Sequence, residues 1–180
     1  YTWTESAGSP VTLSCANIAT ASFVAPAVTA STVFGFQLTV TDNLGATGGA
    51  TVAITVNPNQ LPTVSAGLAQ TANEGTSVRL AGSAADADGT IVSYAWTQTA
   101  GPAATLATPN AASTTVTTPQ VTADTVLTFM LTVTDNNGAA ASATVNVTVK
   151  NVNQPPVASA GSDQTVNEGA AVTLTGSGSD

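Results

Sequence analysis

The side chains of this sequence that could do chemistry are mainly carboxylates and amides. Its 180 residues include ten Asp and Glu, two Lys and Arg, one Cys and no His. Many of the acidic and amide side chains fall near two short proline-containing joints, 57–62 and 151–156, or in loops that could face them. Ca²⁺ takes about six to eight oxygen ligands, so such a cluster is a candidate calcium site. The candidate ligands are Asn57, Asn59, Glu74, Asp86, Asp88, Asp135, Asn151, Asn153 and Asp180.

The same residues have a second interpretation. Asp and Asn commonly end strands and build turns, because their short side chains hydrogen-bond the neighbouring backbone. Acidic loops also keep a surface soluble through the net charge of the chain, which is −8 here. The sequence therefore predicts either calcium at the joints or a set of turn-forming residues, and calcium is the only cofactor that it indicates.

Composition excludes several classes of function. Without His there is no Ser-His-Asp triad and no imidazole metal site, and no nucleophile–base pair or paired carboxylate is evident. We therefore expect no enzymatic activity in this segment. Two cations, Arg79 and Lys150, cannot neutralise a run of phosphates, so we expect no nucleic-acid partner. No apolar run approaches the roughly 20 residues of a membrane span, so we expect no membrane insertion.

An internal repeat organises the chain. Residues 1–8 (YTWTESAG) match residues 94–101 (YAWTQTAG), and residues 73–75 (NEG) match residues 167–169. The match covers the whole chain and divides it at the two proline-containing joints. The predicted segments are the last part of one repeat (1–56), a complete repeat (60–150) and the first part of a following repeat (154–180).

Within the complete repeat, apolar and polar side chains alternate with the period of a β-strand. Leu127, Phe129 and Leu131 fall on one face, and residues 135–138 (DNNG) after them have the composition of a hairpin turn. The sequence predicts an all-β chain of tandem immunoglobulin-like β-sandwiches with about seven strands each and with Trp96 in the core. The strands are expected near 63–71, 77–83, 91–98, 103–107, 113–118, 126–134 and 142–150.

This order of strands positions the candidate ligands at two poles of the sandwich. The loop 86–88 and the hairpin that carries Asp135 are expected at the pole that faces the joint 57–59. Glu74, in the first hairpin, is expected at the opposite pole, near the joint 151–153. The calcium hypothesis therefore predicts that each joint meets carboxylates of the complete repeat.

Several stretches resemble PKD (polycystic kidney disease) domains. They are residues 80–83 (LAGS), 86–96 (DADGTIVSYAW) and 131–135 (LTVTD). The stretch 154–161 (QPPVASAG) is typical of bacterial tandem arrays of PKD and related Ig-like repeats. The resemblance spans essentially the whole chain, and it implies an extracellular β-sandwich used as a stalk, spacer, adhesin module or accessory domain of a secreted enzyme. Because such a fold hosts many functions, the resemblance does not fix one.

Two functions remain open. The first, which composition favours, is an extracellular structural or adhesive array at the cell surface, such as a stalk, an adhesin or a filament subunit. The alternative is a binding or spacer module of a secreted polymer-degrading enzyme, with glycans or proteins as partners. A binding module usually exposes aromatic residues, whereas Trp3 and Trp96 lie on alternating strands that predict core positions. The scarcity of Lys and Arg leaves proteases few cleavage sites, which suits a location outside the cell.

The two ends of the chain are complementary in content. Tyr1 corresponds to Tyr94 and Asp180 to Asp86, so the start holds strands three to seven of a sandwich and the end holds strands one and two. Either these pieces belong to one continuous covalent array, or the tail of one copy supplies the missing strands to the head of the next. We expect the 180-residue chain to self-associate head to tail through these ends.

Overall fold

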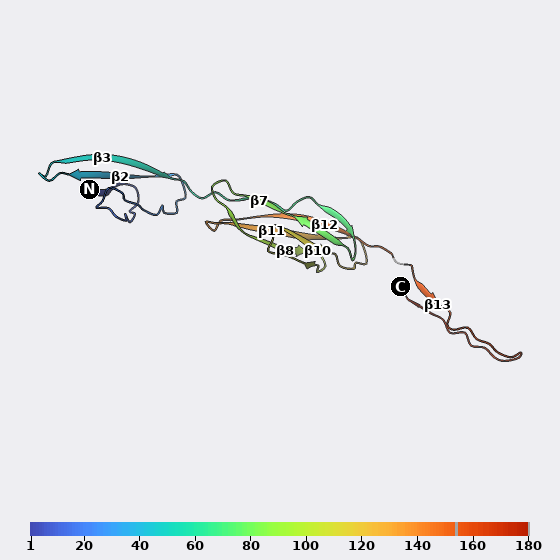
Figure 1. The fold of residues 1–180 in the computed structure, drawn as a ribbon. Helices are drawn as coiled ribbons and strands as arrows, with labels where there is room; N and C mark the ends of the chain where they lie inside the picture. Colours follow the sequence, from blue (N-terminus) through green and yellow to red (C-terminus); the bar gives the residue numbers. More distant parts are fainter. Residues whose placement is uncertain (154, 180) are drawn as a thin grey trace. The chain divides into compact units, whose positions relative to one another are not determined.

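The computed structural model describes residues 1–153 and 155–179, and all regular secondary structure in these residues is β-strand (Figure 1). The predicted all-β fold is confirmed. No described segment forms a helix of the length and apolar character needed to cross a membrane. The described chain divides into two compact units, one made of residues 1–65, 83–95 and 131–143, the other of residues 66–82, 96–130 and 144 onward.

The first unit contains two antiparallel sheets. The larger has the strand order β1 (Thr2–Ala7), β2 (Thr32–Thr41) and β3 (Thr47–Val56), and the smaller pairs β4 (Thr63–Ser65) with β7 (Ser83–Ala85). Along β2, Phe34 and Phe36 alternate with exposed or half-exposed residues and are themselves 1 % and 4 % exposed. The ring of Phe23 lies 6.2 Å from that of Phe34 and 4.8 Å from that of Phe36. These three rings form the apolar centre of residues 1–56.

The second unit contains six shorter strands. They are β5 (Gln70–Asn73), β6 (Ser77–Ala81), β9 (Thr105–Leu106), β10 (Ser113–Thr117), β13 (Val157–Ser159) and β14 (Ser177–Ser179). One sheet has the order β6-β10-β9, and β13 pairs with β14. Three strands have residues in both units, namely β8 (Ile91–Ala100), β11 (Thr125–Asp135) and β12 (Ala140–Lys150). With β5 they form a sheet of order β5-β12-β11-β8, in which β5 runs parallel to β12.

The apolar core of the complete repeat follows the alternation that the sequence predicts. Every second residue of β11 from Leu127 to Val133 is fully buried, and the residues between them are half-buried. Trp96 is 2 % exposed, and its indole N–H donates to the carbonyl oxygen of Ala111 at 3.1 Å. The predicted core position of Trp96 is confirmed, and its one polar atom has an acceptor inside the repeat.

The first two predicted strands of the complete repeat are each broken in two. The expected strand at 63–71 is interrupted after Ser65, and the one at 77–83 is interrupted at Gly82. Gly67 has a φ of +86°, and a Cβ there would lie 2.8 Å from the carbonyl oxygen of Ala81, so only glycine fits this crossing. Because of each break, the two halves of a predicted strand belong to different sheets. For example, β4 pairs with β7, whereas β5 pairs with β12.

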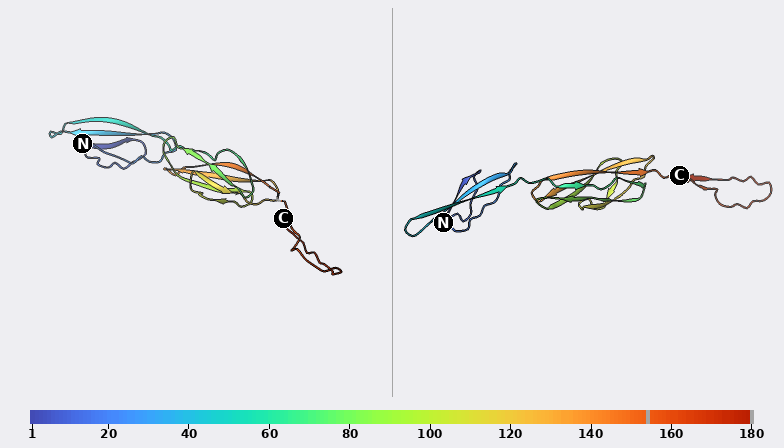
Figure 2. Two further views of the ribbon diagram at one scale, coloured as in Figure 1. Left: turned by 45° about the vertical axis from the view of Figure 1, so that its right-hand side comes forward. Right: turned by 90° about the horizontal axis from the view of Figure 1, so that it is seen from above.

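The outer segments hold fewer strands than the repeat predicts. Between β1 and β2 the chain forms only an isolated bridge, Ser14 with Ser22, where two strands are expected. Residues 155–179 form an open loop closed by β13 and β14, drawn in red in Figure 2. Gln154, at the second joint, and the candidate ligand Asp180 lie outside the described residues.

Candidate functional site

The polar groups around the first joint centre on Asp135, whose side chain is buried at 1 % exposure. Its carboxylate accepts hydrogen bonds from the side-chain amide of Asn59 at 2.7 Å and from the backbone N–H groups of Asn137 and Ala139, both at 2.8 Å. The bond from Asn59 is the largest cause that holds the pKa of Asp135 below its usual value, and the backbone donors add to it, whereas burial opposes it. A buried carboxylate is thus satisfied partly by a residue of the joint.

Two further contacts tie the same joint to the complete repeat. The side-chain amide of Asn137 donates to Oδ1 of Asn59 at 2.7 Å, so Asn59 is bonded on both sides. The backbone N–H of Gln60 donates to Oδ2 of Asp88 at 3.2 Å. Asn57 has a different partner, since its Oδ1 accepts a hydrogen bond from the hydroxyl of Ser31 at 2.8 Å. Loop 86–88, the hairpin of Asp135 and the second half of the joint therefore meet at one pole.

At the second joint, Glu74 connects the joint to a loop of the repeat. Its Oε2 accepts the backbone N–H of Val121 and its Oε1 accepts that of Val152, both at 2.8 Å. These two hydrogen bonds, with that of Val121 the larger cause, lower the pKa of Glu74. The carboxylate is therefore a bidentate acceptor for two main-chain groups that no strand ladder satisfies.

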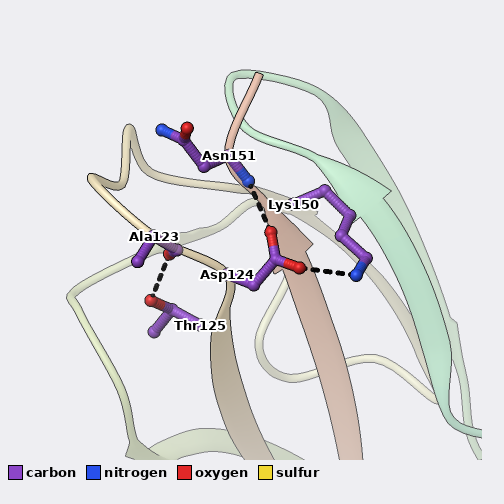
Figure 3. Close-up of polar contacts among 5 residues, drawn as sticks. All are labelled: Ala123, Asp124, Thr125, Lys150 and Asn151. Carbon is purple, nitrogen blue, oxygen red and sulfur yellow. Dashed lines mark hydrogen bonds and ion pairs between the residues drawn. The ribbon is translucent and has the colours of Figure 1, made fainter. Parts of the chain in front are cut away.

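An ion pair between Lys150 and Asp124, which the sequence did not suggest, lies next to the second joint (Figure 3). Oδ2 of Asp124 lies 2.5 Å from Nζ of Lys150, and Oδ1 accepts the backbone N–H of Asn151 at 3.0 Å. The bond from Lys150 is the largest cause that lowers the pKa of Asp124. Both charged side chains are half-exposed, so the pair itself contributes little to stability. The side-chain amide of Asn151 also donates to the carbonyl oxygen of Val121 at 2.5 Å, which fixes the first residue of the joint.

The remaining candidate ligands are placed as follows. Oδ1 of Asp86 accepts the backbone N–H of Asp88 at 3.4 Å, whereas its Oδ2 is shielded from solvent and has no hydrogen-bond partner. Asn153 lines a shallow hollow together with Glu74 and Asn151. Within the described ranges, no three His, Cys, Asp or Glu side chains are close enough to hold a metal ion together. Calcium binding at the joints stays a prediction.

Sequence reasoning missed two residues that act at the joints, Asp124 and Ser31. Lys150 was one signal, since one of only two cations in an acidic chain has a partner worth seeking. Asp124 immediately precedes β11, and Lys150 is the last residue of β12. Because these two strands are antiparallel neighbours in one sheet, the two residues lie at the same end of the strands. Ser31 occupies the position of Asp124 in the preceding copy of the repeat, which shows that this position serves the joint in both copies.

The family model of the K319L-like PKD domain matches residues 1–56 and 66–149, and the chain belongs to this family. Chitinase A of Pseudoalteromonas piscicida is 36 % identical over 154 residues, which are 83 % of this chain but only 18 % of that protein. The solution structure of the PKD domain from KIAA 1837 protein is 35 % identical, with a TM-score of 0.43, and covers 51 % of this chain and 89 % of that one. The first three domains of Drosophila N-cadherin are 13 % identical, with a TM-score of 0.40, over 72 % of this chain and 46 % of that one.

Membership of this family settles two points. The tandem immunoglobulin-like β fold predicted from the sequence is confirmed. PKD domains are non-catalytic modules, so this segment is a module and not the catalytic part of an enzyme.

Proposed function

We propose that this chain is an extracellular spacer module of a secreted polymer-degrading enzyme. The observation that carries the proposal is the 36 % identity with a chitinase over 154 residues. This relationship supports the enzyme-module alternative rather than the adhesive array that composition favours. The chain spans 18 % of the length of that chitinase, so the polymer and the reaction of the whole enzyme are part of this proposal.

A spacing role is supported over a sugar-binding role by the aromatic residues of the complete repeat. These are Tyr94, Trp96 and Phe129. Trp96 and Phe129 are 2 % and 0 % exposed, and Tyr94 is half-buried. Stacking on a sugar ring requires an aromatic ring with an exposed face. None of these three rings is fully exposed, so the repeat has no aromatic surface on which a polysaccharide could stack.

The joints support spacing directly. Proline restricts the backbone of each joint, and carboxylates of the complete repeat hold the joint residues next to it. A joint whose main-chain and side-chain groups are bonded to the repeat loses rotational freedom, which suits a spacer. A spacer of this kind sets the distance between its neighbours without contacting a substrate.

Two experiments test the proposal. The open reading frame that encodes this chain is expected to encode a polymer-hydrolysing domain as well. A pull-down of the purified 180-residue chain on insoluble chitin is expected to leave it in the supernatant. A reading frame that encodes only repeats and a surface anchor would restore the adhesive array, and retention on chitin would replace the spacer by a binding module.

A further inference from the structure

The tip of the hairpin that Asp135 opens carries the one Asn-Gly pair of this sequence, Asn137 and Gly138. Both residues are exposed, Gly138 has a φ of +90°, and a Cβ on Gly138 would meet no atom within 4 Å. The backbone N–H of Gly138 donates to the carbonyl oxygen of Asp135 at 3.3 Å, which is long for such a bond. The backbone nitrogen that follows Asn137 is therefore open to approach and weakly held.

The side-chain amide of Asn137 is held at both of its polar atoms. Its Oδ1 accepts the side-chain amide of Asn136 at 3.0 Å, and its Nδ2 donates to Oδ1 of Asn59 at 2.7 Å. The first bond polarises the amide carbonyl, because a donor stabilises the negative charge that develops on this oxygen when a nucleophile attacks Cγ. The second bond connects the same amide to the first joint. A reaction at this amide therefore changes a contact of the joint.

Two related turns each lack one of these features. The hairpin of the preceding copy has Leu44 at the position of Asn137, so it carries no amide there. The Asp-Gly pair 88–89 also lies at the first joint, but a Cβ on its glycine would overlap Oδ1 of Asn136. That glycine is packed against a side chain, whereas Gly138 is open. The amide and the open glycine thus coincide at Asn137.

We propose that Asn137 is a site of spontaneous deamidation, and that this reaction weakens the attachment of the first joint to the complete repeat. The backbone nitrogen of Gly138 attacks Cγ of Asn137, so that an N–Cγ bond forms and the bond from Cγ to Nδ2 breaks. Nδ2 leaves as ammonia with the proton of the Gly138 N–H, and a cyclic imide remains.

Water then opens the imide. Its hydroxyl adds to one of the two carbonyl carbons, and its other proton returns to the nitrogen of Gly138. The product is aspartate when Cγ takes the hydroxyl, and isoaspartate when the backbone carbonyl carbon of residue 137 takes it. In both cases one neutral amide becomes a carboxylate, and water is the only co-reactant.

Either product loses the hydrogen bond that Asn137 gives to the joint. A carboxylate only accepts, so Oδ1 of Asn59 no longer receives a donor from residue 137. Asn59 cannot reverse its own amide without giving up its 2.7 Å bond to Oδ2 of Asp135. The new carboxylate also adds a negative charge to the hairpin of the buried Asp135, and like charges repel.

The first test measures the reaction itself. The 180-residue chain is incubated at mildly alkaline pH, and peptide mass spectrometry locates each exchange of an amide for a carboxyl group. Asn137 is expected to react at least about tenfold faster than Asn43 and Asn110, which corresponds to a barrier lower by about 1.4 kcal/mol. Isoaspartate at position 137, detected by methyltransferase labelling, is expected because it forms only through the cyclic imide. Asn137→Gln should stop the reaction, since its longer side chain does not close the same ring.

The second test measures the consequence for the joint. Asn137→Asp copies one product and is expected to lower the melting temperature of the complete repeat by about 4–8 °C, the shift that one lost hydrogen bond gives a domain of this size. Leu44→Asp is the matched control, because it adds the same charge at the aligned, exposed position of the other hairpin and should leave that melting temperature unchanged. The incubated original chain should melt lower than before, whereas incubated Asn137→Gln should keep its initial melting temperature.

Three results would overturn the proposal. One is an Asn137 that loses its amide no faster than Asn43 and Asn110 do. The second is an Asn137→Asp variant that melts as the original chain does, since deamidation would then leave the joint as it was. The third is an incubated Asn137→Gln chain that loses as much stability as the incubated original chain, because the loss would then come from another residue.

Discussion

The two copies of the repeat contain the same local structure in different surroundings. The backbone N–H of Trp3 donates to the carbonyl oxygen of Ala16, and that of Trp96 donates to the aligned carbonyl of Pro109, both at 2.7 Å. The indole of Trp3 reaches Ala19 at 3.4 Å and that of Trp96 reaches the aligned Ala112 at 3.3 Å. Yet Trp96 is buried whereas Trp3 is half-buried beside an open cavity. The hydrogen bonds of the strand and its following loop are thus local, whereas burial depends on a segment distant in sequence.

The acidic hairpins show the same contrast. Asp42 accepts the backbone N–H groups of Leu44 and Ala46 at 2.8 Å, as Asp135 accepts those of Asn137 and Ala139. Asp42 is exposed, but Asp135 is buried and bonded to Asn59. One turn motif is therefore a solvated hairpin in one copy and part of a joint in the other. The turn motif alone does not make the carboxylate part of a joint. The contact of Asp135 with Asn59 of the adjoining joint does so.

The largest expected effect separates the two tryptophans. Trp96→Ala removes a buried ring and should cost about 3–5 kcal/mol of unfolding free energy, a large share of what one domain has. Trp3→Ala should cost clearly less, because part of its ring is already in water. Denaturant unfolding of both variants measures the difference. Equal losses would mean that Trp3 is as buried in solution as Trp96.

The next effect separates the two aspartates. Asp135→Ala leaves three donors unsatisfied at a buried position and should lower the melting temperature of the complete repeat, whereas Asp42→Ala should change it little. Asn59→Ala removes only the hydrogen-bond donor that the joint supplies, so its melting temperature should lie between those of the other two variants. Thermal melts followed by circular dichroism compare the three variants. An Asp42→Ala variant as unstable as Asp135→Ala would show that the joint adds nothing to the turn.

A smaller effect should appear as pH falls. Hydrogen bonds lower the pKa of Glu74, Asp124 and Asp135 in the folded chain. Unfolding returns these carboxyls to values of about 4, so their stabilisation is complete above that range and is lost as pH falls through the lower folded values. We expect the melting temperature to stay level from about pH 7 to pH 5 and to drop below about pH 4. Asp135→Asn with Glu74→Gln should flatten that drop, and an unchanged drop would place its cause elsewhere.

Calcium is expected to give the smallest effect. If the first joint binds Ca²⁺, the unpartnered Oδ2 of Asp86 is the oxygen left to receive it, and millimolar calcium should raise the melting temperature slightly by mass action. Asp86→Asn should remove the rise, whereas Asp163→Asn, in the outer segment, should keep it. No difference between calcium and chelator would leave the joint residues as hydrogen-bonding groups alone.

The sequence predicts more of the fold than of the joints, for physical reasons. Alternation defines β11 and the buried Trp96, because a strand's two faces are read directly from every second residue. The break in the strand at Gly67 cannot be predicted from alternation, because it depends on the close approach of the carbonyl oxygen of Ala81 in another strand.

The order of the strands predicts that the acidic groups lie at two poles of the sandwich. It does not predict which groups they hydrogen-bond. The carboxylate of Glu74 binds the backbone N–H groups of Val121 and Val152, which carry no signal in residue type. The bond of Asn57 to Ser31, rather than to an acidic loop, likewise depends on side-chain placement alone.

The parallel pairing of β5 with β12 has a mechanical consequence. The first residue of β5, Gln70, and the last residue of β12, Lys150, lie at opposite ends of one hydrogen-bonded ladder. Tension that passes from β4 into β5 at one end, and from the second joint into β12 at the other, pulls these two strands along their axes in opposite directions. The backbone hydrogen bonds between 70–73 and 147–150 then share the load in shear, instead of opening one after another as in a peeled hairpin. The repeat therefore resists extension wherever the load passes through this ladder.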